Sequence, residues 1–317
     1  MFCTTYNLEQ FGIAVKKIRK ALGLSQVDVK KAVNISPNTL RRLEKGETIP
    51  TYDTIELLSM FYREDLLSIL KSYKLSPSIY DIYRQIDEAI INQKASMNNE
   101  IDDLSNEIIK IKNKINLVDY SHYEQLLDFI KLLKNSTLYD DELGYQHIED
   151  LKSCLMLSIP NFKLSKLSNY NYNHIELRIL LLIALTYKEN KDYEQSTMIL
   201  KTIEKKISRK TETCQETVKI LLKTIGNLSY NYYIIEDLEK SLEYANEGIH
   251  IARRNDTNYI LYSFYARRAI AKILLNRNDY LQDVINSISL LDIAGKKELK
   301  ETYINVFKEK YNLKLPF

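Results

Sequence analysis

The sequence predicts an all-α protein in two parts, an N-terminal bundle of short helices followed by a longer stack of repeated helix pairs. Only seven glycines and five prolines interrupt the 317 residues. Apolar residues recur at three- and four-residue spacing along most of the chain, which is the period of one face of a helix. A similar segment also occurs three times in the C-terminal half, and such recurrence is typical of repeat proteins.

The first two helices are predicted from their boundary signals. An apolar face runs from Leu8 to Leu22 and ends at Gly23. Ser25 then begins a second helix, with Asp28 three residues later as the acidic half of a capping box. The two helices are therefore expected to be separated by a tight turn.

A third and a fourth helix follow on similar signals. Asn34 suits the left-handed conformation of the turn after the second helix. Ser36 and Pro37 open a third helix as its cap and its first-turn proline, and Gly46 closes it. Thr51 can cap the fourth helix.

Positive charge gathers at the N-terminal end of the chain. Residues 1–50 carry nine basic and four acidic side chains, a net charge of +5, which leaves about −2 for the remainder of a chain whose total is +3. A basic module beside a nearly neutral body is the distribution expected when one end of a protein contacts phosphate.

The segments LSQVDVKKAV and NISPNTLRRLEKG resemble the lambda-repressor-like helix-turn-helix family, also called the XRE family, over about residues 8–70. The resemblance implies that the helix from Ser36 to Lys45 is a recognition helix in the DNA major groove. Pro37, Asn38 and Arg42 would then face base edges, and Gln26 would hold a backbone phosphate. The expected DNA contacts are Gln26, Ser36, Pro37, Asn38, Thr39, Arg41, Arg42, Lys45 and Thr48.

Three further positions bear on this resemblance. Arg19 and Glu44 occupy positions that the family often fills with an ion pair, for which we expect a structural role. Lys30 departs from the family, which usually places a small alanine there, so this lysine must extend outward or tilt the helices. The alternative is a helical bundle whose charges are only solvated.

A seven-residue pattern marks the segment after the helix-turn-helix. It consists of Tyr83, Ile90, Met97, Leu104 and Ile111, with Ile101, Ile108 and Ile115 interleaved. An apolar seam of this period can pair with a second subunit, or it can lie against the helices that follow. The expected division is a DNA-binding domain at 1–75, a linker and heptad region at 76–118, and a repeat domain at 119–317.

The repeat domain is predicted from three similar segments, Ile183 to Ser196, Leu228 to Ser241 and Ile270 to Asp283. Each has an apolar residue before Ala or Ser, then a polar turn, then Tyr or Leu. The pattern resembles the tetratricopeptide repeat, a helix-turn-helix unit that stacks into a superhelix. About five helical pairs are expected.

Such a superhelix usually binds an extended peptide in its concave groove, which the first helix of each pair lines. The resemblance places an asparagine that grips peptide backbone at Asn227, while nearby cations would attract a carboxylate. The expected peptide contacts are Lys223, Asn227, Tyr230, Tyr233, Tyr265, Arg268, Lys272 and Asn276. The alternative is that the tyrosines are packing residues and the cations are solvated.

An XRE-type helix-turn-helix joined to tetratricopeptide-like repeats resembles the Rgg, NprR, PlcR and PrgX group of peptide-responsive regulators from Gram-positive bacteria. The resemblance implies a homodimeric, quorum-sensing transcriptional regulator that binds double-stranded DNA, with a palindromic operator, under control of a short signalling peptide. A second hypothesis is a phage-type repressor or antitoxin whose repeats dock a protein partner.

Other classes of function are not favoured by the sequence. No apolar run reaches the roughly 20 residues that cross a bilayer, so we expect a cytoplasmic protein with no membrane partner. Cys3, Cys154 and Cys214 are odd in number and far apart, which argues against a disulfide framework or a metal site. The four histidines are scattered and no catalytic motif is present, so we expect no enzyme, no catalytic residue and no cofactor.

Overall fold

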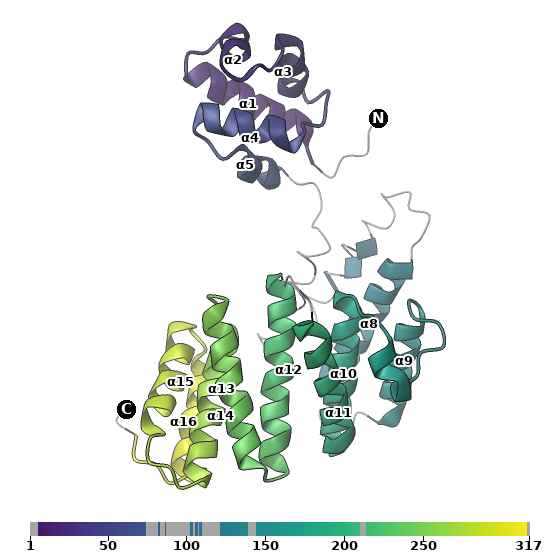
Figure 1. The fold of residues 1–317 in the computed structure, drawn as a ribbon, viewed down its shortest axis with the longest axis vertical. Helices are drawn as coiled ribbons and strands as arrows, with labels where there is room; N and C mark the ends of the chain where they lie inside the picture. Colours follow the sequence, from purple (N-terminus) through teal and green to yellow (C-terminus); the bar gives the residue numbers. More distant parts are fainter. Residues whose placement is uncertain are drawn as a thin grey trace. The chain divides into compact units, whose positions relative to one another are not determined.

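The computed structural model describes residues 6–73, 121–138, 144–209 and 214–315, with a few isolated positions between 82 and 109. These parts of the chain contain helices and turns but no β-strand, which confirms the all-α prediction. They belong to two compact units, which are described in turn (Figure 1).

The first unit is a bundle of five short helices. They are α1 (Leu8–Ala21), α2 (Gln26–Val33), α3 (Pro37–Glu44), α4 (Tyr52–Tyr62) and α5 (Leu66–Ser72). The predicted starts of the first four helices are confirmed. Both sides of the capping box at α2 are formed, because the Ser25 hydroxyl accepts from the Asp28 backbone N–H while the Asp28 carboxylate accepts from the Ser25 backbone N–H. Asn34 is left-handed, with φ of 57°, as its position required.

The core of this unit holds α1 and α3 close together. Its buried side chains include Phe11, Val15, Leu40 and Leu43, which contribute from both helices. At Gly12 the two backbones approach so closely that a Cβ atom would lie 2.5 Å from the carbonyl oxygen of Leu43. The glycine therefore permits the contact that supports α3.

The second unit is a stack of longer helices. They are α8 (Ser121–Leu138), α9 (Tyr145–Met156), α10 (His174–Glu189), α11 (Tyr193–Ser208), α12 (Gln215–Ile234), α13 (Leu238–Arg254), α14 (Leu261–Leu274), α15 (Leu281–Ile293) and α16 (Lys297–Asn305). A 3₁₀ helix (Leu164–Asn169) precedes α10, and a π-helical turn (Val306–Lys310) follows α16.

These helices pack as consecutive pairs (Figure 1). Each helix from α8 to α16 packs against a neighbour in sequence, and the first helices of the pairs, α8, α10, α12 and α14, also contact one another in order. The three sequence segments that resembled one another span the turns of three pairs, α10–α11, α12–α13 and α14–α15. Among the described residues there are four pairs, and α16 follows them as a single helix.

The repeated polar turns have a common geometry. Lys191, Glu236 and Asn276 each adopt a left-handed conformation directly after a first helix. Asp192 and Asp237 then cap α11 and α13 with their side chains. The polar character of these turns therefore reflects helix termination and capping.

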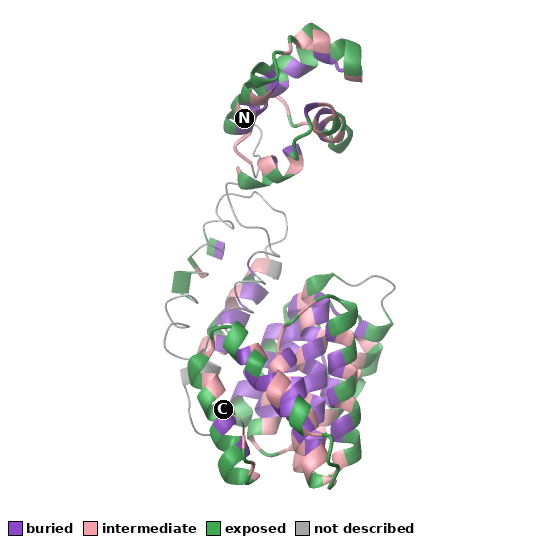
Figure 2. Cartoon of the chain, turned by 90° about the vertical axis from the view of Figure 1, so that its left-hand side faces the viewer, coloured by how far each residue is buried: buried purple, intermediate pink, exposed green. Residues whose placement is uncertain are grey.

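Helix α10 packs against four other helices and is buried on nearly all sides. Figure 2 shows buried residues concentrated in the interior of this unit. Contacts with α8, α9, α11 and α12 account for the apolar run from Ile179 to Leu185. None of the described helices is both long enough and apolar enough to span a bilayer.

Most of the heptad series lies outside the described residues. Of its members only Ile108 is described, and it is buried. Both alternatives for this seam, like the domain limits around it, stay predictions.

Candidate functional site

The α2–turn–α3 segment exposes one face of α3. Leu40, Leu43 and Glu44 are buried on its inner side. The expected DNA contacts that are exposed are Ser36, Asn38, Thr39, Arg41, Arg42 and Lys45, and those that are partly buried are Gln26, Pro37 and Thr48. Cationic and hydrogen-bonding groups therefore share the solvent-facing side of this helix.

Local hydrogen bonds orient several of these side chains. Arg41 Nη2 donates to Asn38 Oδ1 at 2.9 Å, and the hydroxyls of Ser36 and Thr39 are 2.8 Å apart. The side chain of Arg42, in contrast, has no hydrogen bond or ion pair with another described residue. Its guanidinium is thus available to an external partner.

A buried network joins α1, α2 and α3 beneath this face. Arg19 Nε donates to Glu44 Oε1 at 2.5 Å and its Nη2 donates to Glu44 Oε2 at 2.9 Å. Both side chains are largely buried, at 8% and 3% exposure. The hydrogen bond to Glu44 raises the pKa of Arg19. The pair therefore has the structural position that the resemblance implied.

Gln26 belongs to the same network. Its Nε2 donates to Glu44 Oε2 at 2.9 Å, so its amide is positioned at the start of α2 by a carboxylate from α3. Lys30, the departure from the family pattern, is exposed, while its neighbour Val29 is buried in the core. Of the two possibilities for Lys30, its exposure fits an outward-pointing side chain.

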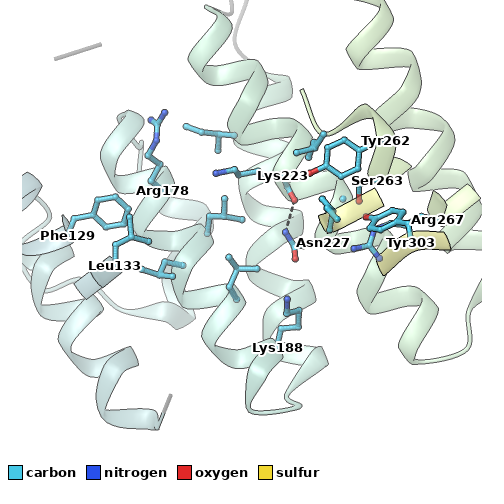
Figure 3. Close-up of a pocket in the computed structure, with 17 residues that line it drawn as sticks. Phe129, Leu133, Arg178, Lys188, Lys223, Asn227, Tyr262, Ser263, Arg267 and Tyr303 are labelled. Atoms are coloured by element: carbon cyan, nitrogen blue, oxygen red, sulfur yellow. Dashed lines mark hydrogen bonds between the residues drawn. The ribbon is translucent and has the colours of Figure 1, made fainter. Parts of the chain in front are cut away.

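The second unit contains a pocket of about 410 Å³ on the side formed by the first helices of the pairs (Figure 3). Residues from α8, α10, α12, α14 and α16 line it. Its apolar wall comprises Phe129, Leu133, Leu181, Leu182, Leu185, Ile220, Ile260 and Leu299. This volume and this mixture of surfaces are typical of ligand sites.

Every charged residue in the described lining of the pocket is a cation. Its cations are Arg178, Lys188, Lys223 and Arg267, and no Asp or Glu occurs among the described residues that line it. Arg178 pairs with Glu216 at 3.1 Å and Lys188 with Glu189 at 3.0 Å, both outside the lining. Lys188 Nζ also lies 5.3 Å from the ring centroid of Tyr230. The arrangement favours an anionic or strongly polar ligand with apolar groups.

Two of the expected peptide contacts on α12 line the pocket, Lys223 and Asn227. Asn227 Nδ2 donates to the backbone oxygen of Lys223 at 2.8 Å, which fixes the orientation of the amide (Figure 3). Tyr230 contacts the lining cations Lys188 and Arg267. Tyr233 binds the C-terminal turn, because its hydroxyl accepts from Lys310 Nζ at 2.9 Å.

The expected contacts on α14 have other partners. Arg268 forms an ion pair with the buried Asp283 of α15, and Lys272 Nζ lies 3.0 Å from the same carboxylate. The Tyr265 hydroxyl accepts from Arg253 of α13 at 2.8 Å, and Asn276 is the left-handed residue in the turn after α14. None of these four lines the pocket.

The residues of α14 that do line the pocket were not identified from the sequence. They are Tyr262, Ser263 and Arg267, on another side of the same helix. Arg267 is adjacent to Arg268 in sequence, and one residue turns a helix by about 100°. The sequence pattern of α14 does not indicate which of its lysines and arginines faces the pocket.

Comparison with known proteins identifies the helix-turn-helix domain and structures of the same fold. Residues 15–69 match a helix-turn-helix family, whereas no curated protein matches the sequence. PlcR of Bacillus thuringiensis, in complex with the peptide PapR7 and DNA, is 18% identical and superposes with a TM-score of 0.60 over 94% of this chain and 99% of that one. Its apo form is 17% identical, with a TM-score of 0.55 over 94% and 98%.

A third structure extends the likeness. Rgg2, the SHP pheromone receptor of Streptococcus dysgalactiae, is 12% identical and has a TM-score of 0.55 over 95% of this chain and 99% of that chain. The likeness to the Rgg and PlcR group is thus confirmed at the level of the fold. The chain carries a helix-turn-helix domain at residues 15–69 and shares the fold of PlcR and Rgg2.

Proposed function

We propose that this protein is a DNA-binding transcriptional regulator whose affinity for DNA is controlled by a short peptide bound in the pocket of the helical repeats. The observation that carries the peptide part is the pocket itself, which combines the fixed amide of Asn227 with four cations and an apolar wall. An extended peptide offers backbone groups, apolar side chains and carboxylate to such a surface.

The DNA-binding part is supported by the helix-turn-helix match and by the exposed face of α3. Asn38 and Arg42 are of the types that pair with adenine and guanine in the major groove. Arg41, Lys45 and Thr39 can contact phosphate from the same face. PlcR, which shares the fold, was solved with both a peptide and DNA.

Control by a peptide requires a difference in affinity between two states of the protein. A peptide changes DNA affinity only if it binds one conformation better than the other. We further propose that the protein acts as a homodimer on a palindromic operator, since two-fold symmetry in a protein is matched by symmetry of its site. Sedimentation of the full chain at equilibrium tests the dimer directly.

The experiment that tests the function has two stages, both with the full chain. Selection from a pool of random DNA duplexes yields the preferred operator, whose affinity is then measured by fluorescence anisotropy. Short synthetic peptides retained by the protein are identified by mass spectrometry and added to that assay. A change in operator affinity supports the proposal. Retention of a folded partner protein but of no peptide contradicts it and favours the protein-docking hypothesis.

A further inference from the structure

The end of the pocket formed by α14 and α16 holds a positive charge without a counter-ion among the described residues. The side chain of Arg267 has no hydrogen bond or ion pair with any of them, and its Nε atom is buried. The guanidinium carbon lies 4.9 Å from the ring centroid of Tyr230, and the side chain lies beside Tyr303 (Figure 3). Burial lowers the pKa of Arg267, so maintaining its charge costs free energy.

A second cation at the same end has a similar environment. The Nζ atom of Lys296, directly before α16, is buried without a hydrogen-bond partner among the described residues. It lies 5.5 Å from the ring centroid of Tyr262, which lines the pocket. The rings of Tyr262 and Tyr303 meet edge to face, with centroids 6.0 Å apart. This end, called here the cation–tyrosine end, therefore gathers positive charge and aromatic surface from two helices.

We propose that the cation–tyrosine end binds a carboxylate of the peptide ligand, with Arg267 as its principal partner, an inference that rests on the proposed function. A guanidinium presents paired donors that match the two oxygens of a carboxylate. The hydroxyl of Ser263 lines the same part of the pocket and offers a further donor. The carboxylate belongs either to the C-terminus of the peptide or to an Asp or Glu side chain.

The apolar lining of the pocket indicates which residues of the peptide lie beside its carboxylate. Leu299 of α16 lines the pocket at this end, and Leu181, Leu182 and Leu185 of α10 are among its other apolar lining residues. Burying the apolar side chains of a ligand against such a wall is favourable. The ligand is therefore a peptide with apolar residues close to its bound carboxylate.

The first test is the stability of the unliganded protein. Arg267→Met keeps most of the side-chain volume and removes the positive charge of a partly buried side chain whose Nε atom is buried. We expect the midpoint of thermal unfolding to rise by a few degrees, because the substitution relieves a desolvation cost that no ligand offsets. A fall in the midpoint means that Arg267 is a structural residue and overturns the inference.

The second test is binding to a defined probe. Three pools of random synthetic peptides are passed over the full-length protein: one with free C-termini, the same pool amidated, and a free pool lacking Asp and Glu. Loss of retention only in the amidated pool assigns the bound group to the C-terminus. Loss only in the pool without acidic residues assigns it to a side chain. Equal retention of all three pools overturns the inference.

The variants complete the design. For Arg267→Met we expect retention to fall by about tenfold or more, the size of a charge-assisted hydrogen bond. Arg254→Met, which removes an exposed arginine of α13, is the matched control and should retain peptides as the wild type does. Undiminished retention of peptides by Arg267→Met overturns this inference and leaves the proposed function unaffected. Failure of the wild type to retain any peptide overturns the proposed function together with it.

Discussion

At the scale of single residues, Arg42 is the side chain on α3 whose role is most sharply testable. It is exposed, and its guanidinium makes no hydrogen bond or ion pair with another described residue. We expect Arg42→Ala to weaken binding to the selected operator by about 1–3 kcal/mol and to reduce discrimination at one base pair, while non-specific binding changes little. Anisotropy with the operator and with a scrambled duplex measures both effects.

The matched control for Arg42→Ala removes a cation elsewhere in the same unit. Lys71→Ala alters an exposed lysine near the end of α5, so operator and scrambled duplex should bind almost as in the wild type. Equal losses of specific and non-specific binding for Arg42→Ala would show that Arg42 contacts phosphate and reads no base.

The buried ion pair beneath α3 leads to a prediction about stability. Glu44→Gln leaves the buried Arg19 charge without its carboxylate and weakens the bond to Gln26. We expect a loss of roughly 3–5 kcal/mol, the usual effect of removing one partner of a buried pair. Hydrogen exchange of the α1 and α3 amides in the full chain measures this loss of stability separately from the stability of the other unit.

Glu47→Gln is the control for that change. Glu47 lies 3.5 Å from Lys45, and both side chains are at least half exposed. An exposed pair of this kind contributes at most about 1 kcal/mol. If Glu44→Gln left exchange in α1 and α3 as slow as Glu47→Gln does, the ion pair would not stabilise the contact between these helices.

At the scale of helices, two glutamates on the outer helices α11 and α13 predict a pH dependence. Burial raises the pKa of Glu204, and the nearby carboxylate of Glu247 adds to that effect. Burial also raises the pKa of Glu247. Because the folded state then holds these protons more tightly than the unfolded state, the two groups stabilise the fold at low pH and lose that contribution as the pH rises above about 4.3.

The double variant Glu204→Gln/Glu247→Gln removes this dependence. Its thermal midpoint should match that of the wild type near pH 4, where the native carboxyls are protonated, and exceed it near pH 7.5. Glu309→Gln, at an exposed carboxylate, should show no such divergence. A variant less stable than the wild type at neutral pH would mean that the ionised glutamates make favourable contacts.

The helices also show which features the sequence could predict. Ser25 with Asp28, and Ser36 with Pro37, are local signals, because a cap and the helix it begins lie within a few residues. The side of α14 that faces the pocket depends on a distant residue. Arg268 is held by the buried Asp283 of α15, and the sequence pattern did not indicate that this aspartate requires a cation from α14. Arg268 and Lys272 were therefore expected to line the pocket, whereas the cation of α14 that does line it is Arg267.

The same distinction holds for the whole molecule. The two-part division followed from composition and repetition, and the order of the helices is as the repeats indicated. The layer of first helices could be predicted because a tetratricopeptide-like stack has one concave side. Which side chains enter the pocket depends on the packing of α8, α10, α12, α14 and α16 together, so only Lys223 and Asn227 among the expected peptide contacts were found in its lining.

Regulation is a property of the whole molecule, and Asn227 offers the way to test it. Its amide is fixed in the pocket by the bond to the Lys223 carbonyl, and it belongs to a different compact unit from α3. We expect Asn227→Ala to weaken peptide binding by up to about tenfold, the effect of one lost hydrogen bond. DNA affinity without peptide should be unchanged, as it should be in the control Asn305→Ala, at an exposed position on α16.

Calorimetry of peptide binding with and without operator closes a thermodynamic cycle. Because coupling is reciprocal, operator must change peptide affinity by the same factor by which peptide changes operator affinity. Unchanged peptide affinity in Asn227→Ala would remove this residue from the site, and a coupling factor of one in the wild type would show that the pocket does not control DNA binding.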